Sequence, residues 1–211
     1  MRTVAVGSGR SPADVDTWQS TSFRWGGPRS SNGTIAAMGR PERRETSGAD
    51  VHRVLDSLRG ADVDTWVSGG WGVDALVGHQ TRPHRDLDLL VPLRRTLQAH
   101  TALSRMGFQL ETDWFPTRFE VVDDHGAVVD VHPVRLDPDG AARLELPDGG
   151  WWHFDAESMD GRGVIGGRPV RCMSVAQQVR NHTGYEPSDS DRHDIAVLCE
   201  HFGIQAPASY G

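Results

Sequence analysis

Two aspartates on one predicted strand are the residues of this sequence best suited to chemistry. Asp86 and Asp88 stand two positions apart in the apolar run DLDLLV. Because side chains alternate between the faces of a strand, both carboxylates should project from one face. Two like charges held so close either raise the pKa of one group or require a cation between them. Mg²⁺ is the expected cation, since it prefers oxygen ligands and also binds substrate phosphates.

A pair of glycines upstream supplies the second half of a nucleotide site. Gly69 and Gly70 follow a strand-like run at 65–67 and precede a short amphipathic segment. Glycine lets a backbone approach a phosphate closely, and the start of a following helix favours an anion. An Asp-x-Asp pair alone is more often a solvated strand end than a catalytic pair. Together with the glycines it predicts a metal-dependent nucleotide site.

These motifs resemble a known superfamily, the nucleotidyltransferases built on the polymerase-beta-like palm. Their signature is a Gly-Gly pair, a short helix and Asp-x-Asp. The string GGWGVDALVG, followed by R-x-H-R-D-x-D, looks like the antibiotic nucleotidyltransferases, nearest to the single-domain lincosamide enzymes. The likeness continues through WFPTRFE, VDVHP, PVRC and HTGYE and covers roughly residues 48–203. Aminoglycoside 2''-nucleotidyltransferases share the glycines, the aspartate pair and GVI-x-GRPVRC but match less well in the C-terminal half.

The resemblance implies a reaction and its cofactors. The chain is expected to transfer a nucleoside monophosphate, with AMP from ATP as the expected donor, to a hydroxyl of a lincosamide, and to release pyrophosphate. Such transfer relies on positioning and on charge neutralisation by metal ions, so two Mg²⁺ ions are expected. An aminoglycoside acceptor of the 2'' type is the first alternative. A regulatory or toxin–antitoxin minimal nucleotidyltransferase is the second, disfavoured because the chain keeps three acids and a full C-terminal segment.

Two metal ions need more carboxylate than one aspartate pair supplies. Asp130 lies in the alternating run 128–132, and the resemblance places an acid there. Its predicted role is metal ligand or general base, two roles that sequence does not separate. Glu120, on the preceding strand, is the rival base. Whether both acids share a face depends on the register of the intervening turn.

Basic and aromatic side chains near these motifs are the candidates for binding the two substrates. Three basic residues stand just before the first aspartate, where they could neutralise a triphosphate, although a solvated loop is the alternative. One arginine of WFPTRFE and two residues of HTGYE are candidates for the antibiotic side. The predicted nucleotide-binding residues are Gly69, Gly70, Arg82, His84 and Arg85, and the predicted antibiotic-binding residues are Arg118, His182 and Tyr185.

Composition narrows the choice of partners. The chain has 211 residues, 37% hydrophobic content and a net charge of -7, which argues against nucleic acid as the substrate. Cys172 and Cys199 lack the spacing of a zinc site or a disulfide framework. No apolar run approaches the length of a membrane span and no signal sequence opens the chain, so a cytoplasmic location is expected. Nothing in the sequence predicts the oligomeric state.

The order of predicted elements indicates an α+β fold with a mixed sheet and helices packed on one side. Residues 1–46, rich in Ser, Gly, Pro and Arg, are expected to be disordered or an over-extended start, and 47–211 to form the nucleotidyltransferase domain with a C-terminal helical part. Helices are predicted at 50–60, 71–77, 93–106, 174–183 and 190–201. Strands are predicted at 64–68, 86–91, 108–111, 118–122, 127–132 and 151–154, with a hairpin at 164–172 and loops over the rest of 136–163.

Overall fold

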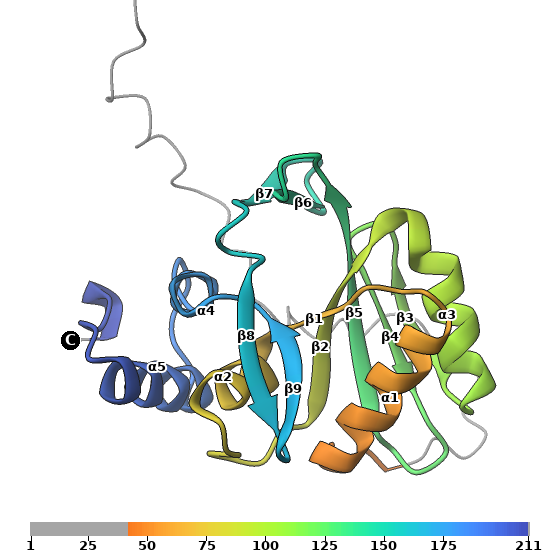
Figure 1. The fold of residues 1–211 in the computed structure, drawn as a ribbon, viewed down its shortest axis with the longest axis horizontal. Coiled ribbons are helices and arrows are strands. Elements are labelled where there is room, and N and C mark those ends of the chain that lie inside the picture. The colour runs from red at the N-terminus through yellow and green to blue at the C-terminus, as the bar shows by residue number, and fades with distance from the viewer. Residues whose placement is uncertain (1–41, 211) are drawn as a thin grey trace, which may run out of the picture.

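The computed structural model describes residues 42–210, which form a mixed nine-stranded sheet with helices (Figure 1). The strands are β1 (Trp66–Val67), β2 (Asp86–Pro92), β3 (Gln109–Trp114), β4 (Arg118–Val122), β5 (Val128–Leu136), β6 (Ala142–Glu145), β7 (Trp151–Phe154), β8 (Gly161–Ile165) and β9 (Arg168–Cys172). The helices are α1 (Gly48–Gly60), α2 (Gly69–Val77), α3 (Thr96–Arg105), α4 (Val175–Asn181) and α5 (Asp189–Phe202), with 3-10 turns η2 (Leu93–Arg95) and η3 (Ala208–Tyr210).

The sheet runs in the order β3-β4-β5-β2-β1-β9-β8, and β6 and β7 extend from β5. β2 lies parallel to β5, whereas β4 is antiparallel to β5 and β1 is antiparallel to β2. The central strand β2 is buried along almost its whole length. The two strands that carry the predicted acids are therefore hydrogen-bonded neighbours in the middle of the sheet.

Helices α1 and α3 cover one face of the sheet (Figure 1). Leu87, Leu89 and Val91 of β2 pack with apolar residues of both helices in the larger core cluster. Alternation along β2 then sends the intervening residues to the other face. Helices α4 and α5 contact α2 rather than this layer. The predicted α+β class with a mixed sheet is confirmed, and α1 and α3 pack on one side of that sheet.

The start of α1 follows from its sequence. The Ser47 side chain accepts a hydrogen bond from the backbone amide of Asp50, and the Asp50 carboxylate accepts one from the backbone amide of Ser47, which forms a capping box. Arg44 donates two hydrogen bonds to Asp50, at 2.7 and 2.9 Å. These bonds hold the pKa of Asp50 well below its usual range.

Several predicted elements needed correction. β8 begins at Gly161 rather than 164, and β3 runs on to Trp114 beyond the predicted 111. The stretch predicted as loops contains β6, whose partners are β5 and β7. β5 also runs on to Leu136 through Pro133, a residue that usually marks the end of a central strand. The predicted helix over 93–106 begins as the 3-10 turn η2 and becomes α-helical only at Thr96.

The prediction for residues 1–41 lies outside the described part of the chain. Residues 42–46 are described and lie against the domain: the Thr46 amide donates to the His84 carbonyl at 2.8 Å. Ordered contacts therefore begin before residue 47. No helix within residues 42–210 combines the length and apolar character that crossing a membrane requires.

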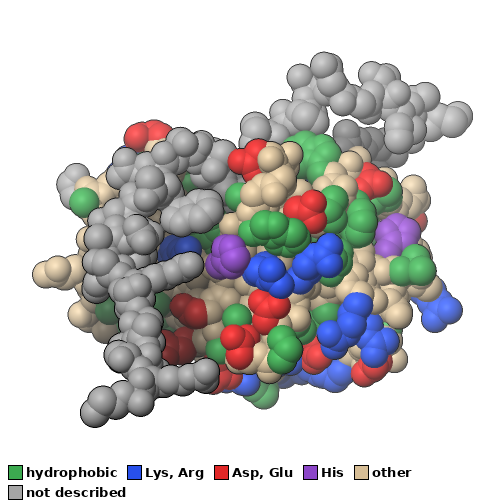
Figure 2. Space-filling view, turned by 90° about the horizontal axis from the view of Figure 1, so that it is seen from above, with side chains coloured by type: hydrophobic (Ala, Val, Ile, Leu, Met, Phe, Trp, Pro, Cys, Tyr) green, Lys and Arg blue, Asp and Glu red, His purple; other side chains and the backbone are tan. Residues whose placement is uncertain are grey.

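The surface seen from the β6–β7 end mixes charge types. On the visible part of this face, basic and acidic side chains alternate with apolar ones, and no continuous basic area forms (Figure 2). One local ion pair of the β5–β6 region, Arg143 with Asp137 at 2.8 Å, is an example.

Candidate active site

Four carboxylates meet on the sheet face opposite α1 and α3. The register pairs Asp88 of β2 with Asp130 of β5, and Asp130 in turn with Glu120 of β4. Asp86 lies two residues before Asp88 on β2, so its side chain points to the same face. The predicted neighbourhood of Asp130 and the aspartate pair is confirmed, and the open question of the turn register is answered: Glu120 shares the face of Asp130.

Burial gives these acids unusual proton affinities. Burial raises the pKa of Asp86 to about 7, and the nearby charges of Asp88 and Glu120 add to the rise. The pKa of Asp88 rises to about 6 and that of Asp130 to about 7, again mainly because they are buried, although positive neighbours such as Arg118 oppose the rise. A cation bound between these carboxylates would neutralise them and allow all of them to ionise.

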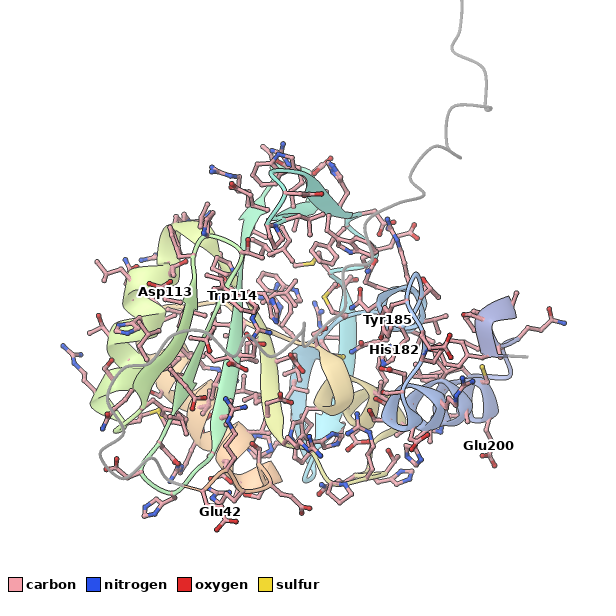
Figure 3. All side chains as sticks on the ribbon, turned by 180° about the vertical axis from the view of Figure 1, so that it is seen from behind. Glu42, Asp113, Trp114, His182, Tyr185 and Glu200 are labelled. Carbon is pink, nitrogen blue, oxygen red and sulfur yellow. The ribbon has the colours of Figure 1, made fainter. Side chains whose placement is uncertain are left out.

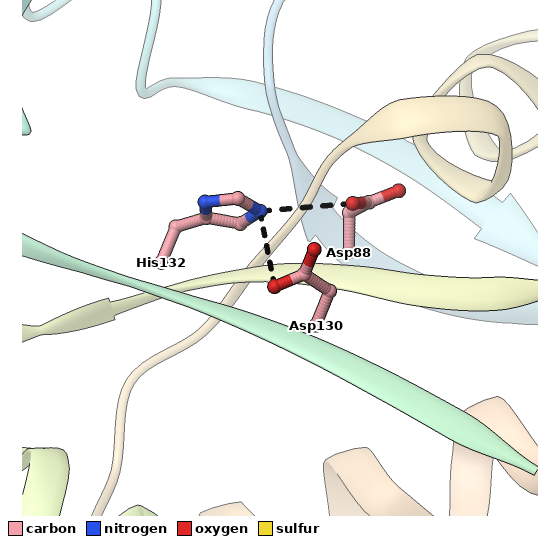
Figure 4. A group of neighbouring side chains, drawn as sticks. All are labelled: Asp88, Asp130 and His132. Carbon is pink, nitrogen blue, oxygen red and sulfur yellow. Dashed lines mark ion pairs between the residues drawn. The ribbon is translucent and has the colours of Figure 1, made fainter. Parts of the chain in front are cut away.

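The carboxylates of Asp88 and Asp130, on one face of two paired strands, fit a hard metal ion. Ligand atoms of Asp88, Asp130 and His132 lie within 4.8 Å of one another (Figure 4). His132 Nε2 is 3.7 Å from an oxygen of each aspartate. A Cβ at Gly69 would lie 2.0 Å from Asp88 Oδ2, so this glycine leaves the carboxylate room to face outward. The two aspartates supply the oxygen ligands that Mg²⁺ prefers.

Sequence reasoning missed His132, although it lies in the VDVHP motif. Its side chain is completely buried. Burial lowers its pKa, while the charge of Asp130 acts in the opposite direction. The signal was available, because His132 stands two positions after Asp130 and so points to the same face of β5.

The Arg118 guanidinium contacts two of the four acids, Asp130 and Glu120. Its Nη1 donates to Asp130 Oδ2 at 2.7 Å, and its Nη2 lies 3.3 Å from Glu120 Oε1. The guanidinium also stacks over Trp114, at 4.7 Å from the ring centroid. Glu120 further accepts a hydrogen bond of 2.8 Å from the Thr112 hydroxyl. The structure therefore gives Arg118 a place beside the third acid.

A cavity of about 710 Å³ opens between the aspartate pair and the C-terminal helices. Asp86 and Asp88 are among its lining residues, whereas Asp130 and Glu120 are not. His182 and Tyr185 lie on the α4–α5 side of the site, and Trp114 lies on the other side (Figure 3). The sequence-predicted residues that line the cavity are Gly69, Gly70, Arg82, His84, Arg85, His182 and Tyr185.

Two of the predicted phosphate-binding residues are held by buried acids that sequence reasoning missed. Arg82 donates to Asp194 of α5 at 2.7 and 2.6 Å, across 112 positions of the chain. His84 pairs with Asp74 of α2 and packs against Trp71, with 4.7 Å between ring centroids. Asp74 lies within the GGWGVDALVG string, but its pairing with His84, like that of Asp194 with Arg82, is made only by the fold.

Asp194 is also the partner of His182. The two side chains are 3.5 Å apart, and Asp194 is 1% exposed. Burial works against ionisation of Asp194, but hydrogen bonds from Arg82 and His182 hold its pKa below the ordinary value. The pKa of His182 is raised: burial lowers it, yet the bonds to Asp194 and to the Gln178 carbonyl outweigh burial. Arg82, Asp194 and His182 thus form a connected group of charged side chains in the wall of the cavity.

The chain is similar to known proteins in both sequence and structure. The family model for aminoglycoside-2''-adenylyltransferases matches residues 50–198. A lincosamide resistance protein from Staphylococcus haemolyticus is 32% identical over 149 residues, which are 71% of this chain and 92% of that protein. A 2''-aminoglycoside nucleotidyltransferase from Escherichia coli is 28% identical over 134 residues, 59% of this chain and 66% of that protein.

Solved structures agree with these matches. The lincomycin-bound crystal structure of the lincosamide antibiotic adenylyltransferase LnuA is similar with a TM-score of 0.68 and 30% identity, and the match covers 74% of this chain and 98% of that one. The structure of ANT(2'')-Ia with adenylyl-2''-tobramycin has a TM-score of 0.57 at 22% identity, with coverage of 74% and 89%, which is a likeness of fold.

Proposed function

Because the chain belongs to the aminoglycoside-2''-adenylyltransferase family and is an antibiotic nucleotidyltransferase, we propose that it transfers AMP from ATP to a hydroxyl of a lincosamide. The reaction would use Mg²⁺ and release pyrophosphate. The observation that carries this proposal is the cluster of Asp86, Asp88 and Asp130 on adjacent strands at the edge of a cavity large enough for a nucleotide.

A lincosamide is the preferred acceptor because this chain matches a larger share of the lincosamide resistance protein than of the aminoglycoside enzyme. The likeness to the lincosamide resistance protein spans nearly that whole protein, whereas the likeness to the 2''-aminoglycoside enzyme spans 66% of it. The structural likeness to LnuA is also the stronger of the two described. An aminoglycoside acceptor remains the alternative, supported by the family model and the 28% identical relative. Family membership argues against a toxin–antitoxin or regulatory role.

The triphosphate is assigned to the cavity side of the aspartate pair. Gly69 and Gly70 begin α2, where backbone N–H groups and the helix start favour a phosphate. Arg85, which lines the cavity and is exposed, is assigned to the phosphates, as are Arg82 and His84. Asp194 and Asp74 would hold those two side chains in place before the nucleotide arrives. Bound Mg²⁺ would supply charge neutralisation at the triphosphate.

The acceptor is assigned to the other side, where β4 borders β5. Asp130 is the proposed third metal ligand and the proposed group that takes the proton of the acceptor hydroxyl, because it lies opposite Asp88 on the adjacent strand. Arg118 would orient that carboxylate through its 2.7 Å hydrogen bond. Glu120 lies one strand further from the aspartate pair than Asp130 and also accepts a hydrogen bond from Thr112, which favours a role in binding over proton transfer.

The proposed function is tested by following product mass. The full chain is incubated with each nucleoside triphosphate, with Mg²⁺ or with EDTA, against lincomycin, clindamycin, kanamycin and gentamicin. We expect an added AMP group on the lincosamides only with ATP and Mg²⁺. Asp88→Asn serves as the inactive control. Modification of kanamycin or gentamicin with no modification of either lincosamide would replace the proposal by the aminoglycoside alternative.

A further inference from the structure

The chain carries a short docked segment that precedes the family-matched residues 50–198. In residues 42–46, Thr46 forms a β-bridge with His84, immediately before the catalytic strand β2. The Thr46 amide donates to the His84 carbonyl at 2.8 Å, and Thr46 is 2% exposed. The segment is therefore attached at the point where the strand of the aspartate pair begins.

The β4–β5 turn contains a position shaped for this segment. Gly126 has a φ of +82°, and a Cβ added there would lie 2.0 Å from the carbonyl oxygen of Glu42. The amide of Arg44 also donates to the Gly126 carbonyl at 3.0 Å. Only glycine accommodates both the left-handed backbone and the close approach. The turn and the segment are thus matched to each other.

Residues 42–46 place the side chain of Arg43 beside two acids, Glu111 and Glu120. Arg43 forms an ion pair with Glu111 of β3, and its Nη2 lies 3.6 Å from Glu120 Oε2. Both carboxylates are largely buried, at 6% and 12% side-chain exposure, while Arg43 is 35% exposed. The arginine therefore covers two acids from the solvent side.

These acids lie on the acceptor side of the proposed site. Glu120 is the cross-strand partner of Asp130 and does not line the cavity assigned to the nucleotide. Arg118 is one positive charge shared between Asp130 and Glu120, and Glu111 adds a third carboxylate. Without Arg43, a cationic acceptor approaching Asp130 would therefore meet a net negative charge. Coulomb attraction for such an acceptor grows with each ammonium group that it carries.

We propose that Arg43 is a specificity-determining residue that sets the charge of the acceptor. By neutralising Glu111 and Glu120, it disfavours acceptors with several ammonium groups relative to acceptors with a single amine. This inference rests on the proposed function for the identity of the acceptor side. It adds a residue outside the family-matched region to the determinants of substrate choice.

The test measures equilibrium binding of lincomycin and of kanamycin by calorimetry, without turnover. The full-length wild type is compared with Arg43→Gln, with Arg43→Lys, which keeps the charge, and with Arg59→Gln. Arg59 is a matched control, because it is an exposed arginine of α1 that pairs with Asp56 away from the acids. Thermal melting of each variant verifies folding, and Arg43→Met, which keeps the apolar stem, replaces Arg43→Gln if the latter folds poorly.

We expect kanamycin to bind Arg43→Gln about fivefold more tightly than wild type, a size typical of one partly exposed charge pair. Lincomycin binding should change less than about twofold, and the gain for kanamycin should shrink at high salt. Arg43→Lys and Arg59→Gln should behave as wild type. Unchanged kanamycin binding, or equal gains for both antibiotics, would overturn the inference. The proposed function fails separately, if the wild type modifies no lincosamide.

Discussion

Replacing Gly69 by alanine places a methyl group against the aspartate pair. The added Cβ would lie 2.0 Å from Asp88 Oδ2 and 2.8 Å from its Cγ, both far inside van der Waals contact. Gly69 also has a φ of +56°, a conformation that alanine adopts at a cost of roughly 1–2 kcal/mol. Either the Asp88 carboxylate rotates away from its neighbours or the start of α2 moves.

Both responses remove a proposed metal ligand from its position. Losing a ligand of this kind should raise the barrier by at least about 3 kcal/mol, which is about a hundredfold in kcat/KM. The backbone strain alone should lower Tm by only about 2–8 °C for a domain of this size. Activity should therefore fall far more than stability.

Gly78→Ala is the matched control for this prediction. Gly78 ends the same helix with a φ of +84°, and a Cβ there meets nothing within 4 Å. It should lose similar stability while keeping most of its activity, as measured by product mass and thermal melting side by side. A Gly69→Ala variant that retains more than about a tenth of wild-type kcat/KM would refute the reasoning. Equal losses in both variants would assign the effect to strain in α2.

Further predictions concern the base, the cavity wall and the thiols. Asp130→Ala should lower turnover by orders of magnitude while ATP still binds, and Glu120→Gln should be milder; the reverse order in steady-state kinetics would assign the base to Glu120. Asp194→Asn should cost about 3 kcal/mol, because the Arg82 charge loses its partner. The pKa of Asp194 is lower in the folded protein than in the unfolded chain, so its ionised carboxylate adds to the free energy of unfolding at pH values above the unfolded-state pKa. This stabilisation is lost as the pH falls through the folded-state pKa. Chemical denaturation should therefore show the stabilities of wild type and Asp194→Asn converging in acid. Burial raises the pKa of the Cys172 thiol to about 12, so iodoacetamide should modify it only after unfolding; rapid native labelling would contradict its burial.

Local patterns in the sequence were sufficient for the chemistry of the aspartate pair. Alternation along a strand is a property of the backbone, so Asp86 and Asp88 could be placed on one face without any tertiary information. The glycine pair at the start of α2 is equally local. These features indicated a metal-dependent nucleotide site and the strand that carries it, and the resemblance of the surrounding motifs implied the family and the reaction.

Other parts of the fold depended on contacts that no local pattern encodes. The four-residue strand β6 is stabilised by its partners β5 and β7 and has little propensity of its own. Pro133 lies within β5 although proline ordinarily ends a central strand. In both cases pairing across the sheet overrides the local preference.

The surroundings of the acids were decided by tertiary structure alone. The register of the β4–β5 turn placed Glu120 opposite Asp130, and Arg118 beside both. Asp194 meets Arg82 across 112 positions, and Arg43, at the start of the described chain, reaches Glu120 near its middle. A charged side chain in a sequence carries no record of its partner, because ion pairs act through space. Only the folded backbone, by fixing which strands and helices are neighbours, determines which charges meet and which carboxylates are left for a metal ion.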